Sequence, residues 1–277
     1  MRPQNPVLPS PFLVRVSRHR MNPAIMATLI LVLLFGAMLV CFEVGRRLGL
    51  ARRAKHPDEP PEGVGIIDGA ILGLLGLSLA FTFSGASERL MLRRAQIVDE
   101  ANAIGTAYLR IDLLPEPVQP AIRDLFRRYL EARIEVFEKI ANPAASNTAL
   151  AKSAALQHEI WSRGVEATRN ATHPGAFLVL PAVNQMFDIT TTRTMAARTH
   201  APIIVIVLLV VLSLLGATLS GYAMSIQAKR NPLHIIVFAL AISATVYVVL
   251  DLEFPRAGLI TLKSTDQAMV QLRNLMK

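Results

Sequence analysis

The sequence predicts an all-α integral membrane protein, with four transmembrane helices and a helical extramembrane domain inserted between the second and the third. Hydrophobic residues make up 52% of the 277 positions and charged residues only 18%, where soluble domains carry about a quarter. Four mainly apolar segments are long enough to cross a bilayer. Residues 88–200 contain no such segment and place apolar residues at helical spacing without strand-like alternation.

The N-terminal residues 1–23 are basic and rich in proline, and we expect them to be disordered. Translation could also start at Met21, and the sequence does not decide between Met1 and Met21. The first transmembrane helix is predicted over residues 24–44, since residues 24–42 carry no charge and can span the hydrocarbon. A signal peptide is the alternative, but its apolar core would be shorter than this segment. A retained helix is therefore favoured.

The second span, residues 64–87, continues without a proline as one long helix to about residue 114. At 1.5 Å per residue such a helix is roughly 70 Å long, so only its first part fits in the bilayer. Small residues recur every three or four positions on one side of the span, and such a side lets a neighbouring helix approach closely. This predicted helix-packing face consists of Gly69, Gly73, Gly76, Ala80 and Ser84.

Beyond the bilayer the long helix carries a short heptad pattern. The pattern consists of Leu90, Ile97, Ile104 and Ile111, with Ala101 and Tyr108 in the other seam positions and Arg94 interrupting it. The favoured interpretation is a helix packed inside the bundle of its own subunit. A symmetric assembly around an axis is the alternative.

Residues 88–200 are predicted to form the helical domain, with breaks at Asn142-Pro143 and at His173-Pro174-Gly175. The third and fourth spans follow at 201–227 and 233–250, and residues 251–277 form an interfacial tail. Four spans place both termini and the helical domain on the same side. Counts of Lys and Arg slightly favour the cytoplasmic side of the inner membrane, although long loops weaken that rule.

Composition and motifs exclude several function classes. The formal net charge of +9 comes without a nucleic-acid-binding motif, and arginines beside the spans suit anionic lipid, so the bilayer is the expected partner. No catalytic, nucleotide-binding or metal-ligand spacing is present, and the lone Cys41 lies in an apolar run. We therefore expect no enzymatic activity, no catalytic or metal-binding residues and no cofactor.

Four residues of the second span suggest an ion pathway. Ser78, Phe81, Thr82 and Phe83 are the pore or gate candidates, because aromatic rings can form a constriction that gates by dewetting. They could equally pack or meet lipid. At the membrane exit of the same helix, Arg89, Arg93 and Arg94 could attract anions or bind phospholipid headgroups.

The end of the fourth span offers a charged partner for these arginines. Asp251 directly follows eighteen uncharged residues, so it marks the edge of the bilayer. Because Arg93 and Arg94 lie at a similar depth, the sequence suggests an ionic clasp between the second and fourth spans, with Arg94 and Asp251 as the first pair to test by charge reversal. Independent anchoring of each residue to headgroups is the alternative.

The segments LGLLGLSLAFTFSGASERLMLRRAQIVDEANAIGTAYLRIDLLPEP and DLEFPRAGLI resemble the bacterial bestrophin-like membrane family. The resemblance spans about residues 29–277 and implies four transmembrane helices with a helical domain between the second and the third. Bestrophins are pentameric chloride channels with cytosolic termini, whose second helix lines a narrow hydrophobic neck. Polar residues of the matching motif are Arg93, Arg94, Glu100, Asn102, Tyr108, Arg110, Asp251 and Arg256.

The expected function is an oligomeric bestrophin-like ion channel, pentameric by analogy, with small inorganic ions as ligands and anions as the first candidate. The alternative is a non-conducting membrane scaffold or stress-response protein, whose helical domain binds a protein through the heptad seam. A transporter is disfavoured, because the spans show no broken-helix repeat and almost no charge near the midplane.

Overall fold

The computed structural model describes residues 23–56, 64–140, 142–225, 232–255 and 259–276, and within these ranges every regular element is a helix. The expected disorder of residues 1–22, the loop at 57–63 and Arg256 lie outside them. The helices are α1 (Pro23–Lys55), α2 (Val64–Leu109), α3 (Gln119–Glu138), α4 (Pro143–Arg169), α5 (Val179–Arg198), α6 (Ile203–Met224), α7 (Pro232–Glu253) and α8 (Lys263–Leu275), with 3-10 turns η1 (Arg110–Leu113), η2 (Glu116–Val118) and η3 (Pro174–Leu178).

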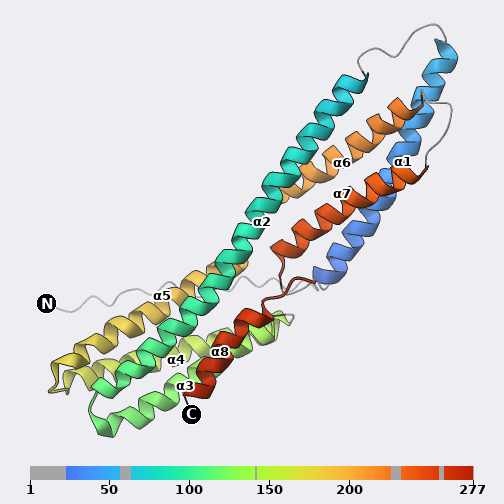
Figure 1. Cartoon of the computed structure of the whole chain (residues 1–277). Coiled ribbons are helices and arrows are strands. Elements are labelled where there is room, and N and C mark those ends of the chain that lie inside the picture. The colour runs from blue at the N-terminus through green and yellow to red at the C-terminus, as the bar shows by residue number, and fades with distance from the viewer. Residues whose placement is uncertain (1–22, 57–63, 141, 226–231, 256–258, 277) are drawn as a thin grey trace, which may run out of the picture.

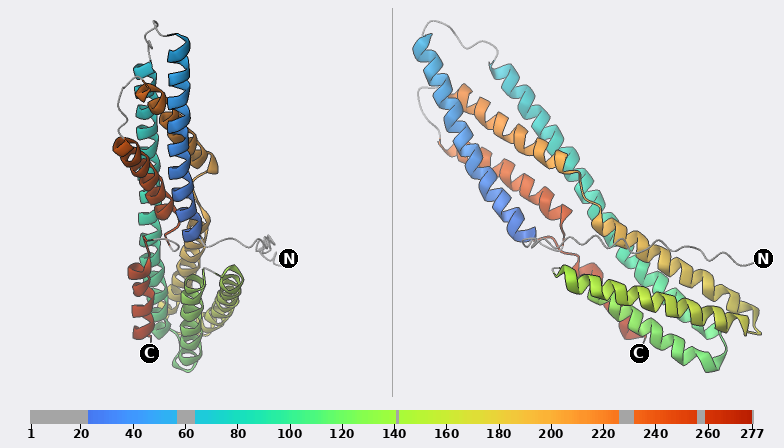
Figure 2. Two further views of the ribbon diagram at one scale, coloured as in Figure 1. Left: turned by 90° about the vertical axis from the view of Figure 1, so that its right-hand side faces the viewer. Right: turned by 180° about the vertical axis from the view of Figure 1, so that it is seen from behind.

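The molecule is elongated and α2 runs along most of its length (Figure 1). One end consists of α1, α6, α7 and the first half of α2, and the other of α3, α4, α5, α8 and the second half of α2 (Figure 2). The 46 residues of α2 form one helix, because no proline interrupts them. The two ends therefore share a single continuous element.

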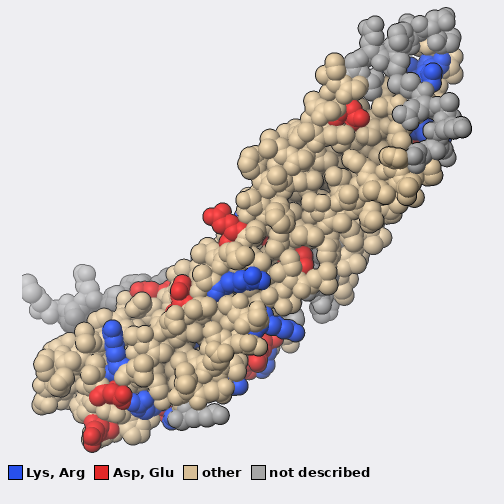
Figure 3. Space-filling view, viewed as in Figure 1, with Lys and Arg blue, Asp and Glu red and all other residues tan. Residues whose placement is uncertain are grey.

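Four helices are long and apolar enough to cross a membrane, within Thr28–Lys55, Gly65–Leu113, Pro174–Met224 and Pro232–Glu253. Only 17 to 28% of each apolar window is buried inside the chain, so most of this apolar surface needs lipid or another protein around it. On the face shown in Figure 3, charged side chains are frequent on the end built by α3, α4, α5 and α8, whereas the end built by α1, α6 and α7 is mostly uncharged between its border with that end and a basic tip.

Glycines bring α1 and α6 into backbone contact. A Cβ added at Gly45 would lie 1.9 Å from the carbonyl oxygen of Thr218, and one added at Gly221 would lie 2.2 Å from that of Phe42. Helices in lipid associate through such close approach, because burying leucine against leucine gains little there. These two glycines therefore permit the α1–α6 pairing.

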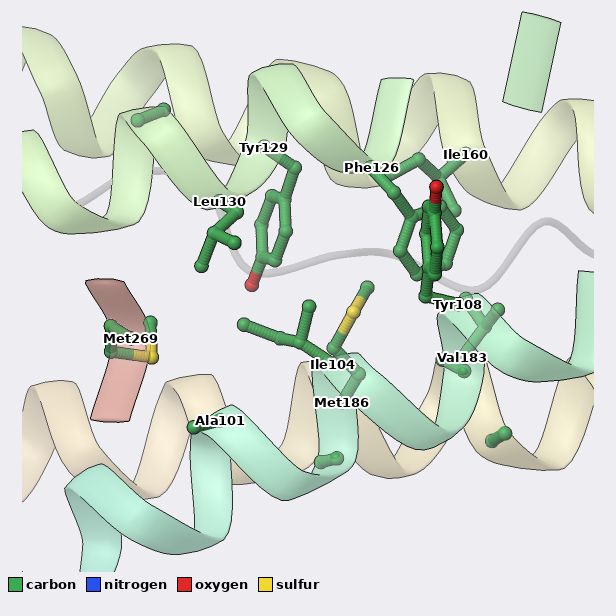
Figure 4. Close-up of a cluster of buried hydrophobic side chains, with 14 of the residues drawn as sticks. Ala101, Ile104, Tyr108, Phe126, Tyr129, Leu130, Ile160, Val183, Met186 and Met269 are labelled. Atoms are coloured by element: carbon green, nitrogen blue, oxygen red, sulfur yellow. The ribbon is translucent and has the colours of Figure 1, made fainter. Parts of the chain in front are cut away.

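The second half of α2 packs into the core of its own subunit. The seam residues Leu90, Ile97, Ile104 and Ile111 are all buried, and they meet side chains from α3, α4, α5 and α8. Figure 4 shows this cluster, with Ile104 and Tyr108 close to Met186 and Phe126. The favoured interpretation of the heptad pattern is confirmed, and the seam is not available as a docking surface.

The chain after α7 joins the same core. Met269 of α8 and the following Met276 are buried, and Leu272 lies over Gly105 of α2, where an added Cβ would be 3.2 Å from its Cδ1. The carbonyl of Met276 accepts a hydrogen bond from the hydroxyl of Tyr108 at 3.4 Å. Residues predicted as an interfacial tail thus include a helix that covers α2.

Candidate functional site

One face of α2 has no partner within the chain. Its small residues are all exposed, namely Gly69, Gly73, Gly76, Ala80 and Ser84. A Cβ added at any of the three glycines would meet no atom within 4 Å. The opposite side of the same segment is buried through Leu75 and Leu79. The predicted helix-packing face is therefore open to lipid or to another copy of the chain.

The pore or gate candidates lie around the exposed side of the same segment, where Phe81 is about 80° or more from the three glycines and about 160° from Phe83. The side chains of Phe81 and Phe83 are 69% and 45% exposed, so both rings point away from the core of the chain. Ser78 and Thr82 are half-buried, and the Thr82 hydroxyl donates to the carbonyl of Ser78 at 2.7 Å. That hydroxyl is satisfied by its own helix, which leaves the two aromatic rings as the groups that project outward.

A charged cluster joins α2 to α7 where the apolar segment of α2 ends. Arg89 donates to Glu253 Oε2 from Nη2 at 2.8 Å and from Nε at 3.0 Å. Glu253 is buried and its other oxygen accepts the backbone N–H of Ala201 at 2.9 Å. This one carboxylate therefore connects α2, α7 and the residues just before α6.

Arg93 strengthens the same junction through backbone carbonyls. Its guanidinium donates to the carbonyls of Glu253 at 2.9 Å, Thr199 at 2.7 Å and Ala196 at 3.3 Å. His200 lies 3.4 Å from Glu253 Oε1 and stacks on Phe254. These contacts hold the ends of α5 and α7 against α2.

An ionic clasp between the second and fourth spans is present, but the pair Arg94–Asp251 does not form it. Asp251 is buried and accepts the backbone N–H of Ile260 at 2.9 Å, so it holds the turn after α7. The Nε of Arg94 is buried without a hydrogen-bond partner. The charged contact between α2 and α7 is formed by Arg89 and Glu253. Arg89 lies one turn before Arg93, and Glu253 lies two residues after Asp251.

A double-mutant cycle tests this assignment. Arg89→Gln, Glu253→Gln and the double variant are expected to show a coupling energy of about 1 to 3 kcal/mol, because two N–H groups of Arg89 donate to the same oxygen of a buried carboxylate. The readout is denaturation in mixed micelles, followed by the fluorescence of the single Trp161. A cycle with Arg94→Gln and Asp251→Asn is the control, and stronger coupling there would restore the original clasp.

Glu100 forms the most deeply buried ionic cluster of the described residues. Its carboxylate accepts from Arg133 Nε of α3 at 2.5 Å and from Arg193 Nη1 of α5 at 2.6 Å. Arg193 also lies 3.5 Å from Asp266 of α8. The guanidinium of Arg193 stacks 3.7 Å from the ring of Phe137. The Glu100 carboxylate thus joins α2, α3 and α5, and α8 is added through the contact of Asp266 with Arg193.

Electrostatics within this cluster are dominated by burial and by opposite charge. Burial opposes the charge of Arg133, but the adjacent Glu100 carboxylate outweighs it and holds the pKa of Arg133 above its ordinary value. Burial also raises the pKa of the nearby Tyr129 to about 12. The Tyr129 hydroxyl is 2.8 Å from Thr190 Oγ1 and accepts from Gln157 at 3.2 Å. These groups therefore support the structure and are not poised for proton transfer near neutral pH.

The remaining motif residues are spread along α2. Asn102 is exposed on a groove between α2 and α5, and Tyr108 is buried under the guanidinium of Arg123 at 4.7 Å. Arg110 donates to the carbonyl of Leu178 at 2.9 Å. The structure therefore brings Arg93 and Asp251 to one junction and places Glu100, Asn102, Tyr108 and Arg110 at successive levels of the other end.

The sequence analysis did not predict that Arg133 and Arg193 are buried partners of Glu100. It also did not predict that the Glu253 carboxylate joins α2 to α7. A signal for Arg133 was present, because it interrupts an apolar stripe of α3 between Tyr129 and Phe137. A charged residue at a core position predicts a buried partner. In the described part of the chain, no group of three His, Cys, Asp or Glu residues gathers as a metal site.

These features define a helical, multi-pass membrane protein whose longest helix leaves one face uncovered. The profile of the Bestrophin-like domain matches residues 31–266, so the chain belongs to the Bestrophin-like family. A comparison with curated proteins finds no match.

Two solved structures are similar in fold. Both are variants of a bacterial bestrophin homolog from Klebsiella pneumoniae. One matches with a TM-score of 0.63 and 12% identity over 91% of this chain and 98% of the homolog. The other matches with a TM-score of 0.53 and 14% identity over 90% of this chain and 98% of the homolog. At these identities the likeness shows the fold alone.

Proposed function

We propose that the protein is an oligomeric ion channel, in which α2 of each subunit turns its uncovered face toward a shared axis. The observation that carries the proposal is the wide uncovered side of this helix, where Gly69, Gly73 and Gly76 meet nothing in the chain and Phe81, about 80° or more round the helix from them, is 69% exposed. Membership of the Bestrophin-like family supports it. The pentamer that the resemblance to bestrophins implies is the expected assembly.

In the proposed arrangement, residues 24–44, 64–87, 201–227 and 233–250 cross the inner membrane. Residues 88–200 form a helical domain outside the bilayer, inserted between the second and third spans, and the termini lie on its side, the cytoplasmic one. Support comes from the four apolar helices and from the concentration of charge on the other end of the molecule. The protein then acts through conduction and not through catalysis.

For the alternative scaffold function, the proposed docking surface is buried. It required the heptad seam of α2 for docking a protein partner, and Leu90, Ile97 and Ile104 are buried in the subunit's own core. The channel is therefore the function that the exposed surfaces support best.

The test is the mass of the detergent-purified protein, followed by ion flux from liposomes that contain it. We expect a closed oligomer whose flux rises several-fold in Phe81→Ala or Phe83→Ala, because smaller side chains relieve a hydrophobic constriction. Phe177→Ala is the matched control, since this ring is 71% exposed on η3, far along the chain from the apolar segment of α2. A monomer or dimer without flux would contradict the proposal.

A further inference from the structure

The last part of α1 extends beyond the apolar segment of the molecule. Glu43 is the first charged residue of α1, and Asp68, the first of α2, accepts a hydrogen bond from the Ser220 hydroxyl of α6 at 3.2 Å. The close approach of α1 to α6 at Gly45 lies at the same level of α6. These charges therefore mark one edge of the hydrocarbon. From there α1 continues through residues 44–55, here called the α1 tip, for about 18 Å.

The α1 tip has a surplus of positive charge, visible as blue side chains at the upper right of Figure 3. Its basic residues are Arg46, Arg47, Arg52, Arg53 and Lys55. The Glu43 carboxylate accepts from Arg46 Nη2 at 3.0 Å and from Arg47 Nε at 2.9 Å, so this acid is already paired. Among the residues that the structure describes, no carboxylate pairs with Arg52 or Lys55.

One side of α1 changes from apolar to basic as the helix leaves the bilayer. Val44 and Leu48 are 46% and 56% exposed, and Arg52 and Lys55 follow on the same side, also exposed. These four side chains lie within about 40° of Leu48 round the helix, and Lys55 stands about 10 Å beyond Leu48 along the axis. Exposed apolar residues followed by cations suit an acyl chain and its headgroup at a membrane interface.

A hollow lies at the basic end of this side. It encloses about 370 Å³ and is lined by Ala51, Arg52, Lys55 and His56. Arg52 Nη1 donates to the Tyr222 hydroxyl of α6 at 3.2 Å, which holds the guanidinium without neutralising it. Arginine and lysine both donate to phosphate oxygens, and basic pockets at the ends of membrane spans bind acidic headgroups. The hollow therefore has the chemistry of a phosphate site.

We propose that the α1 tip binds an acidic phospholipid, with its phosphate between Arg52 and Lys55 and its acyl chain along Val44 and Leu48. The apolar part of this side favours a lipid over a free phosphate ion, because an ion gains nothing from the exposed leucine. Through Arg52 and Tyr222, the bound lipid would stabilise the α1–α6 pair. The inference depends on insertion in a membrane and not on ion conduction.

The experiment is the thermal midpoint of the detergent-purified full chain, measured in micelles of a neutral detergent after addition of phosphatidylglycerol or of phosphatidylcholine. The wild-type midpoint is expected to be at least about 3 °C higher with phosphatidylglycerol than with phosphatidylcholine. The double variant Arg52→Gln, Lys55→Gln should lose more than half of that difference. The charge-conserving variant Arg52→Lys, Lys55→Arg should keep most of it. Each protein is compared with itself, so a lower midpoint of a variant does not enter the result.

Arg163→Gln with Arg169→Gln is the matched control, because it removes two exposed positive charges from α4, at the other end of the molecule. It should keep the full difference between the two lipids. An undiminished difference in the Arg52→Gln, Lys55→Gln variant would overturn the site, and so would an equal loss in the α4 variant, which would indicate net charge alone. The same rise in midpoint with soluble glycerol 1-phosphate would overturn the assignment to a lipid.

Discussion

Glu100→Gln is expected to lower the free energy of unfolding by about 3 to 5 kcal/mol. The carboxylate is fully buried and is the partner of two buried guanidinium groups, Arg133 and Arg193. Without it, two positive charges remain in the core, and the remaining carboxylate that the described residues place against them is Asp266, 3.5 Å from Arg193. Removing one member of a buried ion pair costs more than the pair contributes, because the remaining charge is left unsolvated.

The measurement is denaturation in mixed micelles, followed by the fluorescence of Trp161, whose ring lies against Phe187 across the α4–α5 contact. Asp99→Asn is the control, since this neighbour in sequence is exposed and should change the unfolding free energy by less than about 0.5 kcal/mol. The triple variant Glu100→Leu, Arg133→Met, Arg193→Met should recover most of the loss. Equal stability of Glu100→Gln and the wild-type protein would refute the structural role of the cluster.

Gly45→Ala is expected to destabilise the protein by about 1 to 3 kcal/mol or more, because overpacking forces the two backbones apart. The new Cβ would lie 1.9 Å from the carbonyl oxygen of Thr218, a backbone atom that cannot rotate away. The pairing of α1 with α6 should loosen, together with the hydrogen bond from Arg52 to the Tyr222 hydroxyl. The thermal midpoint of the purified protein in detergent provides the readout.

Gly36→Ala offers a matched control on the same helix, because a Cβ there meets nothing within 4 Å. It should be neutral or stabilising by up to about 1 kcal/mol, since alanine favours helix more than glycine does. If both variants behave alike, the close contact between α1 and α6 does not contribute to stability. Gly221→Ala approaches the same contact from the opposite helix and should resemble Gly45→Ala.

The helices could be predicted from the sequence because their causes are local or periodic. Apolar segments of bilayer length mark the helices that can span a membrane, and the seven-residue spacing from Leu90 to Ile111 marks the side of α2 that enters the core. The absence of proline predicts the continuity of α2, which ends at Leu109 and continues as the turn η1. Each of these properties depends on the spacing within one segment.

Pairings between segments could not be predicted in the same way. Nothing in the sequence indicates that Gly45 and Gly221 bring α1 and α6 together, or that Gly69, Gly73 and Gly76 of α2 meet nothing within the chain. The choice of Asp251 instead of Glu253 failed for a similar reason. Which carboxylate turns toward α2 depends on the rotation of α7 and on the turn that Asp251 itself holds.

The unbroken length of α2 has a mechanical consequence. From Ser87 to Leu109 it extends about 33 Å beyond its apolar segment, without a hinge and braced by the Glu100 cluster midway. A helix held in this way would tilt as one rigid rod. A tilt of about 5° at the bilayer edge would displace its far end by about 3 Å, so a small push on the turns around η1 would be transmitted to the rings of Phe81 and Phe83 without any change of helical structure.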